Sequence, residues 1–165
     1  MRSPAVARIL LIVFAYFSLH TLAKSAWGVP WLPSLAMMPV IWFAWREGLT
    51  PGLMAAVPAG LLEDLLSAGP FGLGLLSNGV LAVLAALFKQ IFMYEDRLHF
   101  MGLAIAAVLI RGGLDFLGFV LEGGEWAGAR FLVLVMAKQL ALGTGAAWFT
   151  FLILGGMDPR FRAVR

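Results

Sequence analysis

The stretch GLLEDLLSAGPFGLGLLS, Gly60–Ser77, decides how this chain is organised. An apolar segment delivers two adjacent carboxylates, Glu63 and Asp64, and a breaker cluster of Ser, Ala, Gly and Pro follows at 67–70. A second apolar run opens at Phe71. This pattern predicts a helix, a tight polar corner and a second helix. Ionisable groups this deep in apolar sequence indicate a functional site, although a surface loop whose acids face water is the alternative reading.

The composition predicts an all-α integral membrane protein. The 165 residues leave room for one domain, so we read 1–165 as a single transmembrane domain. Hydrophobic residues make up 62% of the chain and charged residues only 13%, about half the charged share of a soluble globular protein. Charge-free runs such as Leu65–Phe88 exceed the roughly 20 residues that cross a bilayer.

The same composition excludes other classes. There is no cysteine, so disulfides and thiolate metal sites are impossible. The net charge of +3 comes from scattered lysines and arginines, which argues against a nucleic-acid site and for basic loops on one side of a membrane.

Hydropathy and turn signals predict six transmembrane helices, a count that puts both termini on one side. The second is expected to be short or irregular, because its 14 residues carry Pro39 and span only about 21 Å. A signal peptide is the less favoured reading of the first helix, since no clean cleavage site follows it. The third contains Gly52, Ala56 and Gly60 four apart, a spacing that lets helices approach closely. The expected helices are Ile9–Ala23, Leu32–Trp45, Leu49–Leu66, Phe71–Phe88, Phe100–Leu121 and Arg130–Leu154.

Basic residues outside the apolar cores predict the orientation. With the N-terminus inside, the non-cytoplasmic segments hold only Lys24 and Arg130. Positive charge is typical of cytoplasmic loops, so both termini are expected in the cytoplasm. The cytoplasmic segments would then hold Arg2, Arg8, Arg46, Lys89, Arg97, Arg160, Arg162 and Arg165.

Three charged residues fall inside the predicted membrane helices at similar depth. Arg111 and Asp115 are four apart on one helix face, and Lys138 lies about as deep in the last helix. We predict an intramembrane charge network in which Asp115 pairs with Arg111 or Lys138, because an unpaired charge in hydrocarbon is costly. A transport or catalytic role is the alternative.

Asp64 is predicted to be a structural clamp. An aspartate before the corner can accept hydrogen bonds from the free N–H groups that open the next helix, around Phe71–Gly74. Gly69, Gly72 and Gly74 would then serve tight turning and close approach.

Catalytic and metal-binding templates fit poorly. Nothing matches HExxH or GxSxG. His20 and His99 lack companions at metal-ligand spacing, so no metal site or cofactor is expected. Asp64 and Asp115 resemble a carboxylate dyad, but Arg111 would hold Asp115 ionised. We therefore expect no enzyme.

The chain resembles the rod shape-determining protein MreD family. The matching features are its length, its six-helix hydropathy, a proline-led second helix rich in Leu and Trp, and Asp115 in the fifth helix. The most specific match is G-x-x-x-G-L-L-x-D-L-L-S followed by a turn and L-G-x-x-L-L-S, here Ala56–Ser77. Ala56 stands where the family often has glycine, and Glu63 is not part of the pattern.

The resemblance implies a non-enzymatic inner-membrane scaffold of the bacterial elongasome, which sets cell shape and lateral peptidoglycan synthesis. Its expected partner is an MreC-like single-helix coiled-coil protein, held by its transmembrane or juxtamembrane part. MreB-like filaments, a RodA-like glycosyltransferase and a penicillin-binding transpeptidase would be indirect partners.

The alternative is a substrate-binding subunit of a vitamin or small-molecule transporter. The family is similar in fold to the S-components of energy-coupling-factor transporters, which dock through an Ala-x-x-x-Ala face on the first helix. Here Ala7, Leu11, Ala15, Leu19 and Ala23 alternate small with large side chains, which argues against such docking.

Overall fold

The computed structural model describes residues 3–27, 34–66, 71–91, 97–121 and 129–157, and within these ranges the chain forms helices and no strands. This agrees with the expected all-α class. The helices are α1 Ser3–Trp27, α2 Met37–Glu47, α3 Leu49–Leu66, α4 Leu73–Ile91, α5 Arg97–Leu121 and α6 Ala129–Met157.

Four of these helices are long and apolar enough to cross a membrane. The candidate spans are Ala5–Ala26, Leu49–Leu66, Leu73–Ile91 and Ala137–Gly156, and the apolar part of α5, Leu98–Leu114, is shorter. α2 has 11 residues, or about 16 Å, roughly half of the hydrocarbon thickness. The chain is a multi-pass membrane protein by these criteria, and the count of six spans stays a prediction.

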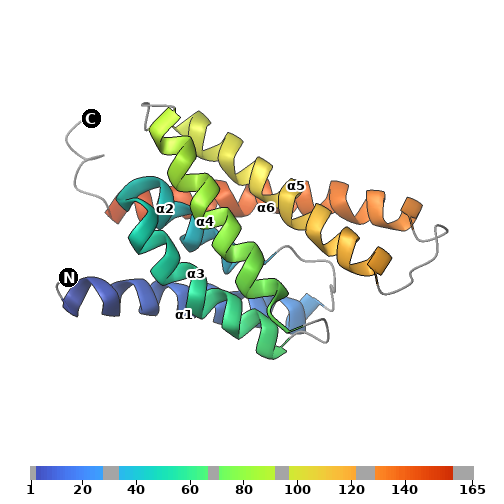
Figure 1. The fold of residues 1–165 in the computed structure, drawn as a ribbon, viewed down its shortest axis with the longest axis horizontal. Helices are drawn as coiled ribbons and strands as arrows, with labels where there is room; N and C mark the ends of the chain where they lie inside the picture. Colours follow the sequence, from blue (N-terminus) through green and yellow to red (C-terminus); the bar gives the residue numbers. More distant parts are fainter. Residues whose placement is uncertain (1–2, 28–33, 67–70, 92–96, 122–128, 158–165) are drawn as a thin grey trace.

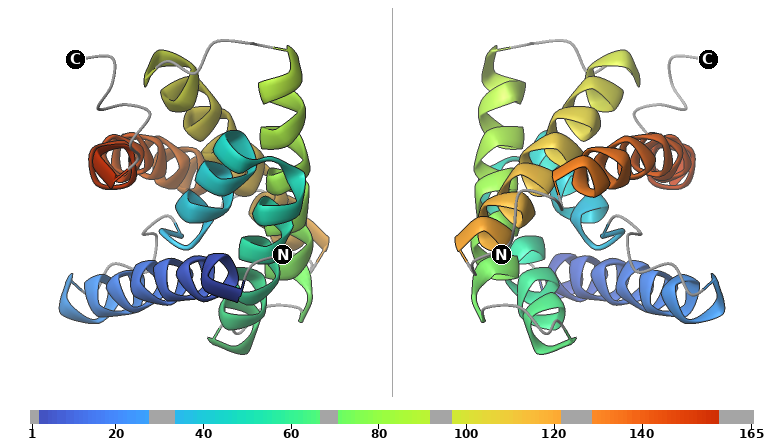
Figure 2. Two further views of the ribbon diagram at one scale, coloured as in Figure 1. Left: turned by 90° about the vertical axis from the view of Figure 1, so that its left-hand side faces the viewer. Right: turned by 90° about the vertical axis from the view of Figure 1, so that its right-hand side faces the viewer.

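α2 lies in the interior and contacts each of the other five helices. Every residue from Met37 to Arg46 is buried. Figure 2 shows α1 and α6 on either side of α2, and Figure 1 shows α5 and α6 running together on the side away from α1. A helix that is apolar all round and buried all round needs no lipid-facing stripe.

The ends of α2 correct its expected bounds. The helix begins at Met37 rather than Leu32, and Pro39 then falls in its first turn, where a missing N–H costs no hydrogen bond. It ends where Gly48 adopts a positive φ of 102° and donates to the carbonyl of Phe43 at 3.1 Å. Only glycine adopts that conformation without strain, so the sequence itself sets the sharp turn into α3.

An aromatic cluster fixes α2 against α5 and α6. Trp42 makes edge contacts with Phe100 of α5 and Phe151 of α6, with ring centroids 5.4 and 5.8 Å apart. Trp45 packs on the same Phe100 ring at 5.3 Å. All four rings are buried, and these offset geometries suit aromatic quadrupoles.

The expected small-residue face of α3 is confirmed, but it serves two neighbouring helices. A Cβ added to Gly52 would lie 2.5 Å from the Cβ of Ala44 on α2. A Cβ added to Gly60 would lie 2.4 Å from the Cα of Leu75 on α4. Ala56 between them is 1% exposed. The backbones of α2, α3 and α4 therefore approach closely because these side chains are small or absent.

The two ends of the bundle differ in chemistry. At one end Arg8 pairs with Glu47 at 3.6 Å, and the Lys89 ammonium donates to the carbonyl of Arg46 at 2.6 Å. We call this the basic end. The opposite end holds the turn from α3 into α4, and we call it the corner end. Three cations expected on the cytoplasmic side thus share one end of the structure.

Candidate functional site at the α3–α4 corner

Asp64 joins the last turn of α3 to the first turn of α4. Its Oδ1 accepts a hydrogen bond from the N–H of Gly74 at 2.7 Å, and its Oδ2 accepts one from the N–H of Leu75 at 3.1 Å. α4 begins at Leu73, so these donors belong to the first turn and have no partner within the helix. The side chain is 5% exposed. The predicted hydrogen-bonding clamp is confirmed, with its donors shifted because α4 begins later than Phe71.

Glycines make room for the clamp. A Cβ on Gly74 would lie 2.7 Å from Oδ1 of Asp64 and 3.0 Å from the carbonyl oxygen of Gly60. Gly72 has a positive φ of 99°, which favours glycine. Gly60, Gly72 and Gly74 therefore have the turning and close-approach roles expected of them, whereas Gly69 lies outside the described residues.

Glu63, next to Asp64, is the centre of a second set of contacts that the sequence did not predict. Its Oε1 accepts a hydrogen bond from Ser34 Oγ. Its Oε2 accepts one from Asn78 Nδ2 and one from Arg111 Nη1, each at 2.9 Å. The Glu63 side chain is only 9% exposed. We call Ser34, Glu63, Ser77, Asn78 and Arg111 the corner cluster.

Arg111 connects α5 to this cluster. Besides the ion pair with Glu63, its Nη1 donates to the hydroxyl of Ser77 at 2.5 Å. Ser77 in turn donates to the carbonyl of Gly74 at 3.0 Å. The arginine thus reaches from one helix to two others, and a single side chain couples α5 to both sides of the corner.

The predicted charge network is only partly described. Arg111 forms an ion pair with Glu63 of α3. The Asp115 side chain lies outside the described residues, so its pairing stays a prediction. Lys138 lies on an exposed face of α6. The prediction considered Arg111 and Lys138 as partners of Asp115 and did not consider Glu63 as a partner of Arg111.

A signal for Glu63 was present in the sequence. Glu63 and Arg111 both fall within predicted membrane helices, and their charges are opposite. A buried charge needs a partner more than an exposed one does. Charge sign and depth made the two residues possible partners, but neither says which helices face each other, so they could not single out this pair.

The carboxylate oxygens at the corner take part in hydrogen bonds that hold the helices together. Both carboxylate oxygens of Asp64 and both of Glu63 accept hydrogen bonds. Among the residues that the structure describes, no group of three His, Cys, Asp or Glu side chains could hold a metal ion. The geometry is that of a rigid polar joint between three helices.

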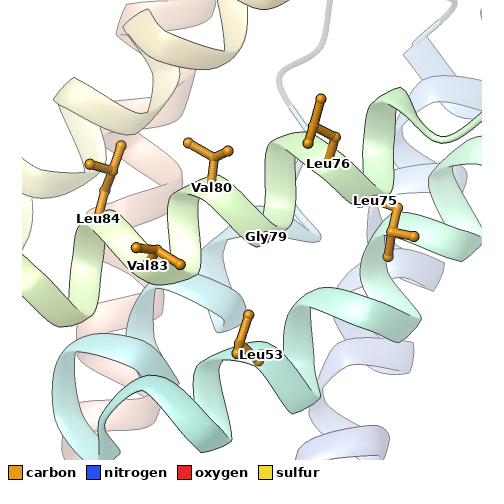
Figure 3. A pocket seen from close by; sticks show the side chains of 7 residues that line it. All are labelled: Leu53, Leu75, Leu76, Gly79, Val80, Val83 and Leu84. Atoms are coloured by element: carbon orange, nitrogen blue, oxygen red, sulfur yellow. The ribbon is translucent and has the colours of Figure 1, made fainter.

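An apolar groove runs along the outside of α3 and α4 (Figure 3). Its volume is about 430 Å³, and Gly79 forms a notch in which a Cβ would meet nothing within 4 Å. Leu53 projects from α3, and the other side chains come from α4 (Figure 3). The lining residues are Leu53, Leu75, Leu76, Gly79, Val80, Val83 and Leu84.

Comparison with known proteins gives no family for this chain, so its class is assigned from its composition and its helices. No family model, curated protein or solved structure matches this chain. The apolar composition and the four candidate spans among the described helices define an all-α, multi-pass membrane protein.

Proposed function

We propose that this protein is a non-enzymatic scaffold of the bacterial inner membrane, of the MreD kind, that binds the transmembrane or juxtamembrane part of an MreC-like protein. It would link cytoplasmic MreB-like filaments to lateral peptidoglycan synthesis outside the membrane. A RodA-like glycosyltransferase and a penicillin-binding transpeptidase would be its indirect partners in the elongasome. The basis is the motif resemblance together with the geometry of the corner.

The Asp64 clamp is the observation that carries this proposal. The segment with the most specific resemblance, Ala56–Ser77, contains a fixed joint in which Asp64 binds two N–H groups of α4. A scaffold requires a surface that holds its shape while a partner is bound, and a saturated, buried joint supplies this. A proton carrier would instead need a carboxylate that changes partners.

The distribution of cations supports a cytoplasmic location for both termini. Arg8, Arg46 and Lys89 come from α1, α2 and α4, and contacts join them at the basic end. Under the positive-inside rule this end faces the cytoplasm, and the corner end faces the other side. A coiled-coil partner on the outer side would then meet the corner end.

The exposed face of α1 disfavours the transporter alternative. Leu11 and Leu19 are 71% and 43% exposed. Leu11 comes between the small side chains of Ala7 and Ala15, and Leu19 follows Ala15 one turn later. Close docking of a helix on an Ala-x-x-x-Ala face needs small side chains throughout the contact.

Co-purification in mild detergent tests the proposal. We expect a tagged chain to recover a single-helix coiled-coil protein. Recovery of an ATPase pair together with a bound vitamin would support the transporter subunit and overturn the scaffold. Recovery of neither partner, with a folded bait at native expression, would also contradict the scaffold.

A further inference from the structure

Arg8 holds an exposed guanidinium at the basic end. Its guanidinium carbon lies 5.9 Å from the centre of the Phe43 ring on α2, within cation–π range. Its ion pair with Glu47 is long, at 3.6 Å, and the two side chains are 55% and 38% exposed. That distance exceeds a hydrogen bond, and an exposed pair of this kind is weak. The N–H donors of Arg8 therefore face the surroundings of the protein rather than a close acceptor in the described chain.

Two further cations raise the positive potential around Arg8. Arg46 comes three residues after Phe43 and directly before Glu47, so it belongs to the part of α2 on which Arg8 lies. The Lys89 ammonium is bound to the Arg46 carbonyl. Contacts thus join three cations and one carboxylate at this end, and such an excess of positive charge attracts an anion.

The depth of these cations matches the headgroup layer of a membrane. Arg8 lies three residues inside the candidate span that begins at Ala5, or about 4.5 Å along the helix. Lys89 lies two residues before the end of the span Leu73–Ile91. Long basic side chains at this depth extend toward the interface, where the phosphates of lipids lie.

An exposed apolar strip continues from Arg8 along α1. Leu11, Ala15 and Leu19 follow it at steps of three and four residues and are all exposed, so they lie on one side of the helix. From Arg8 to Leu19 the strip is about 16 Å long, close to the hydrocarbon depth of one leaflet. A cation above an apolar strip suits an amphiphile, since a soluble anion would contact the cation alone.

We propose that the basic end binds an anionic phospholipid, whose phosphate contacts the Arg8 guanidinium while an acyl chain lies along Leu11, Ala15 and Leu19. A guanidinium binds a phosphate through two parallel hydrogen bonds, which its loose pair with Glu47 does not supply. An acidic protein segment is disfavoured because it would leave the apolar strip uncovered. This proposal requires a membrane location and does not depend on the scaffold function.

Native mass spectrometry of the full chain in a mild neutral detergent tests the proposal, with phosphatidylglycerol as the anionic probe and phosphatidylcholine as the zwitterionic one. We expect the wild type to bind phosphatidylglycerol more tightly. Arg8→Gln should weaken that binding about five-fold, the equivalent of roughly 1 kcal/mol for one basic side chain near an anionic surface, and leave phosphatidylcholine binding unchanged. Glu47→Gln should strengthen phosphatidylglycerol binding, because it removes the carboxylate that competes for Arg8. Both substitutions change exposed side chains, so both variants should fold.

Lys24→Gln is the matched control, because Lys24 is exposed near the other end of the same helix and its loss changes the net charge equally. Equal losses of phosphatidylglycerol binding in Arg8→Gln and Lys24→Gln would overturn the proposal, since the lipid would then respond to net charge alone. Binding of glycerol 3-phosphate as tight as that of phosphatidylglycerol would also overturn it, because the site would then hold a free phosphate. An acidic peptide that binds with the same dependence on Arg8, without any preference for phosphatidylglycerol, would assign the basic end to a protein segment and reject the lipid.

Discussion

Arg111 on α5 and Glu63 on α3 form an ion pair of 2.9 Å between residues 48 positions apart in the chain. The pair is mostly buried, with side chains 17% and 9% exposed. No contact between the α3 and α5 backbones accompanies it. The pair thus links two helices whose described backbones do not approach each other closely, and it lies beside the Asp64 clamp.

Removing one member of this pair should be more damaging than removing both. We expect Arg111→Met to lower the stability of the detergent-solubilised protein by about 3–5 kcal/mol, because it leaves Glu63 buried without its counter-charge. The double variant Arg111→Met with Glu63→Gln should recover much of that loss. Thermal unfolding monitored by tryptophan fluorescence would measure the four proteins of the cycle.

The exposed pair of Arg8 and Glu47 is the matched control for this cycle. Its side chains are 55% and 38% exposed, so its coupling should be at most about 1 kcal/mol. If the losses at Arg111 and Glu63 are simply additive, the buried ion pair does not contribute as described.

Gly60 and Gly79 should respond in opposite ways to alanine. In Gly60→Ala the new Cβ would lie 2.4 Å from the Leu75 Cα, so α3 and α4 must move apart. We expect the free energy of unfolding to fall by about 3 kcal/mol, the upper end of the usual cost of overpacking. In Gly79→Ala nothing lies within 4 Å, and the gain in helix propensity is up to about 1 kcal/mol. Melting temperatures of the two variants give the comparison, and equal effects would contradict the close packing at Gly60.

Topology reporters test the orientation that follows from the basic end. Fusions after Arg165 should report a cytoplasmic location, and fusions at Gly124 should report the opposite side. Adding two arginines near Gly124 tests the rule further. It should weaken the non-cytoplasmic signal of the reporter fused at Gly124 and leave the signal of the C-terminal fusion unchanged. The reverse pattern in the unmodified chain would place the corner end in the cytoplasm and remove the proposed contact with an outer partner.

Local sequence signals predicted the corner well. Leu49–Leu66 was expected as a helix and is one. The Asp64 clamp followed from a carboxylate placed before free N–H groups. The rest depended on tertiary contacts. The burial of α2 on all sides could not be read from a short apolar segment, since apolar residues also face lipid. The Glu63–Arg111 pair required knowing which helices lie side by side, which periodicity does not give.

The stability and partner binding of Asp64 variants test the central claim, that Asp64 is a structural clamp. Asp64→Ala loses two hydrogen bonds to a charged acceptor and should cost about 3 kcal/mol. Asp64→Asn keeps one acceptor for Gly74 but places an amide against the N–H of Leu75, so we expect roughly half that loss.

The most direct measurement is retention of the coiled-coil partner by folded Asp64→Asn and Asp64→Ala proteins in a detergent pull-down, scaled to the wild type. The clamp predicts that retention follows stability, with the wild type highest, Asn intermediate and Ala lowest. Equal loss of the partner in both variants, while both remain folded, would contradict the account, because the charge of Asp64 would then be its function.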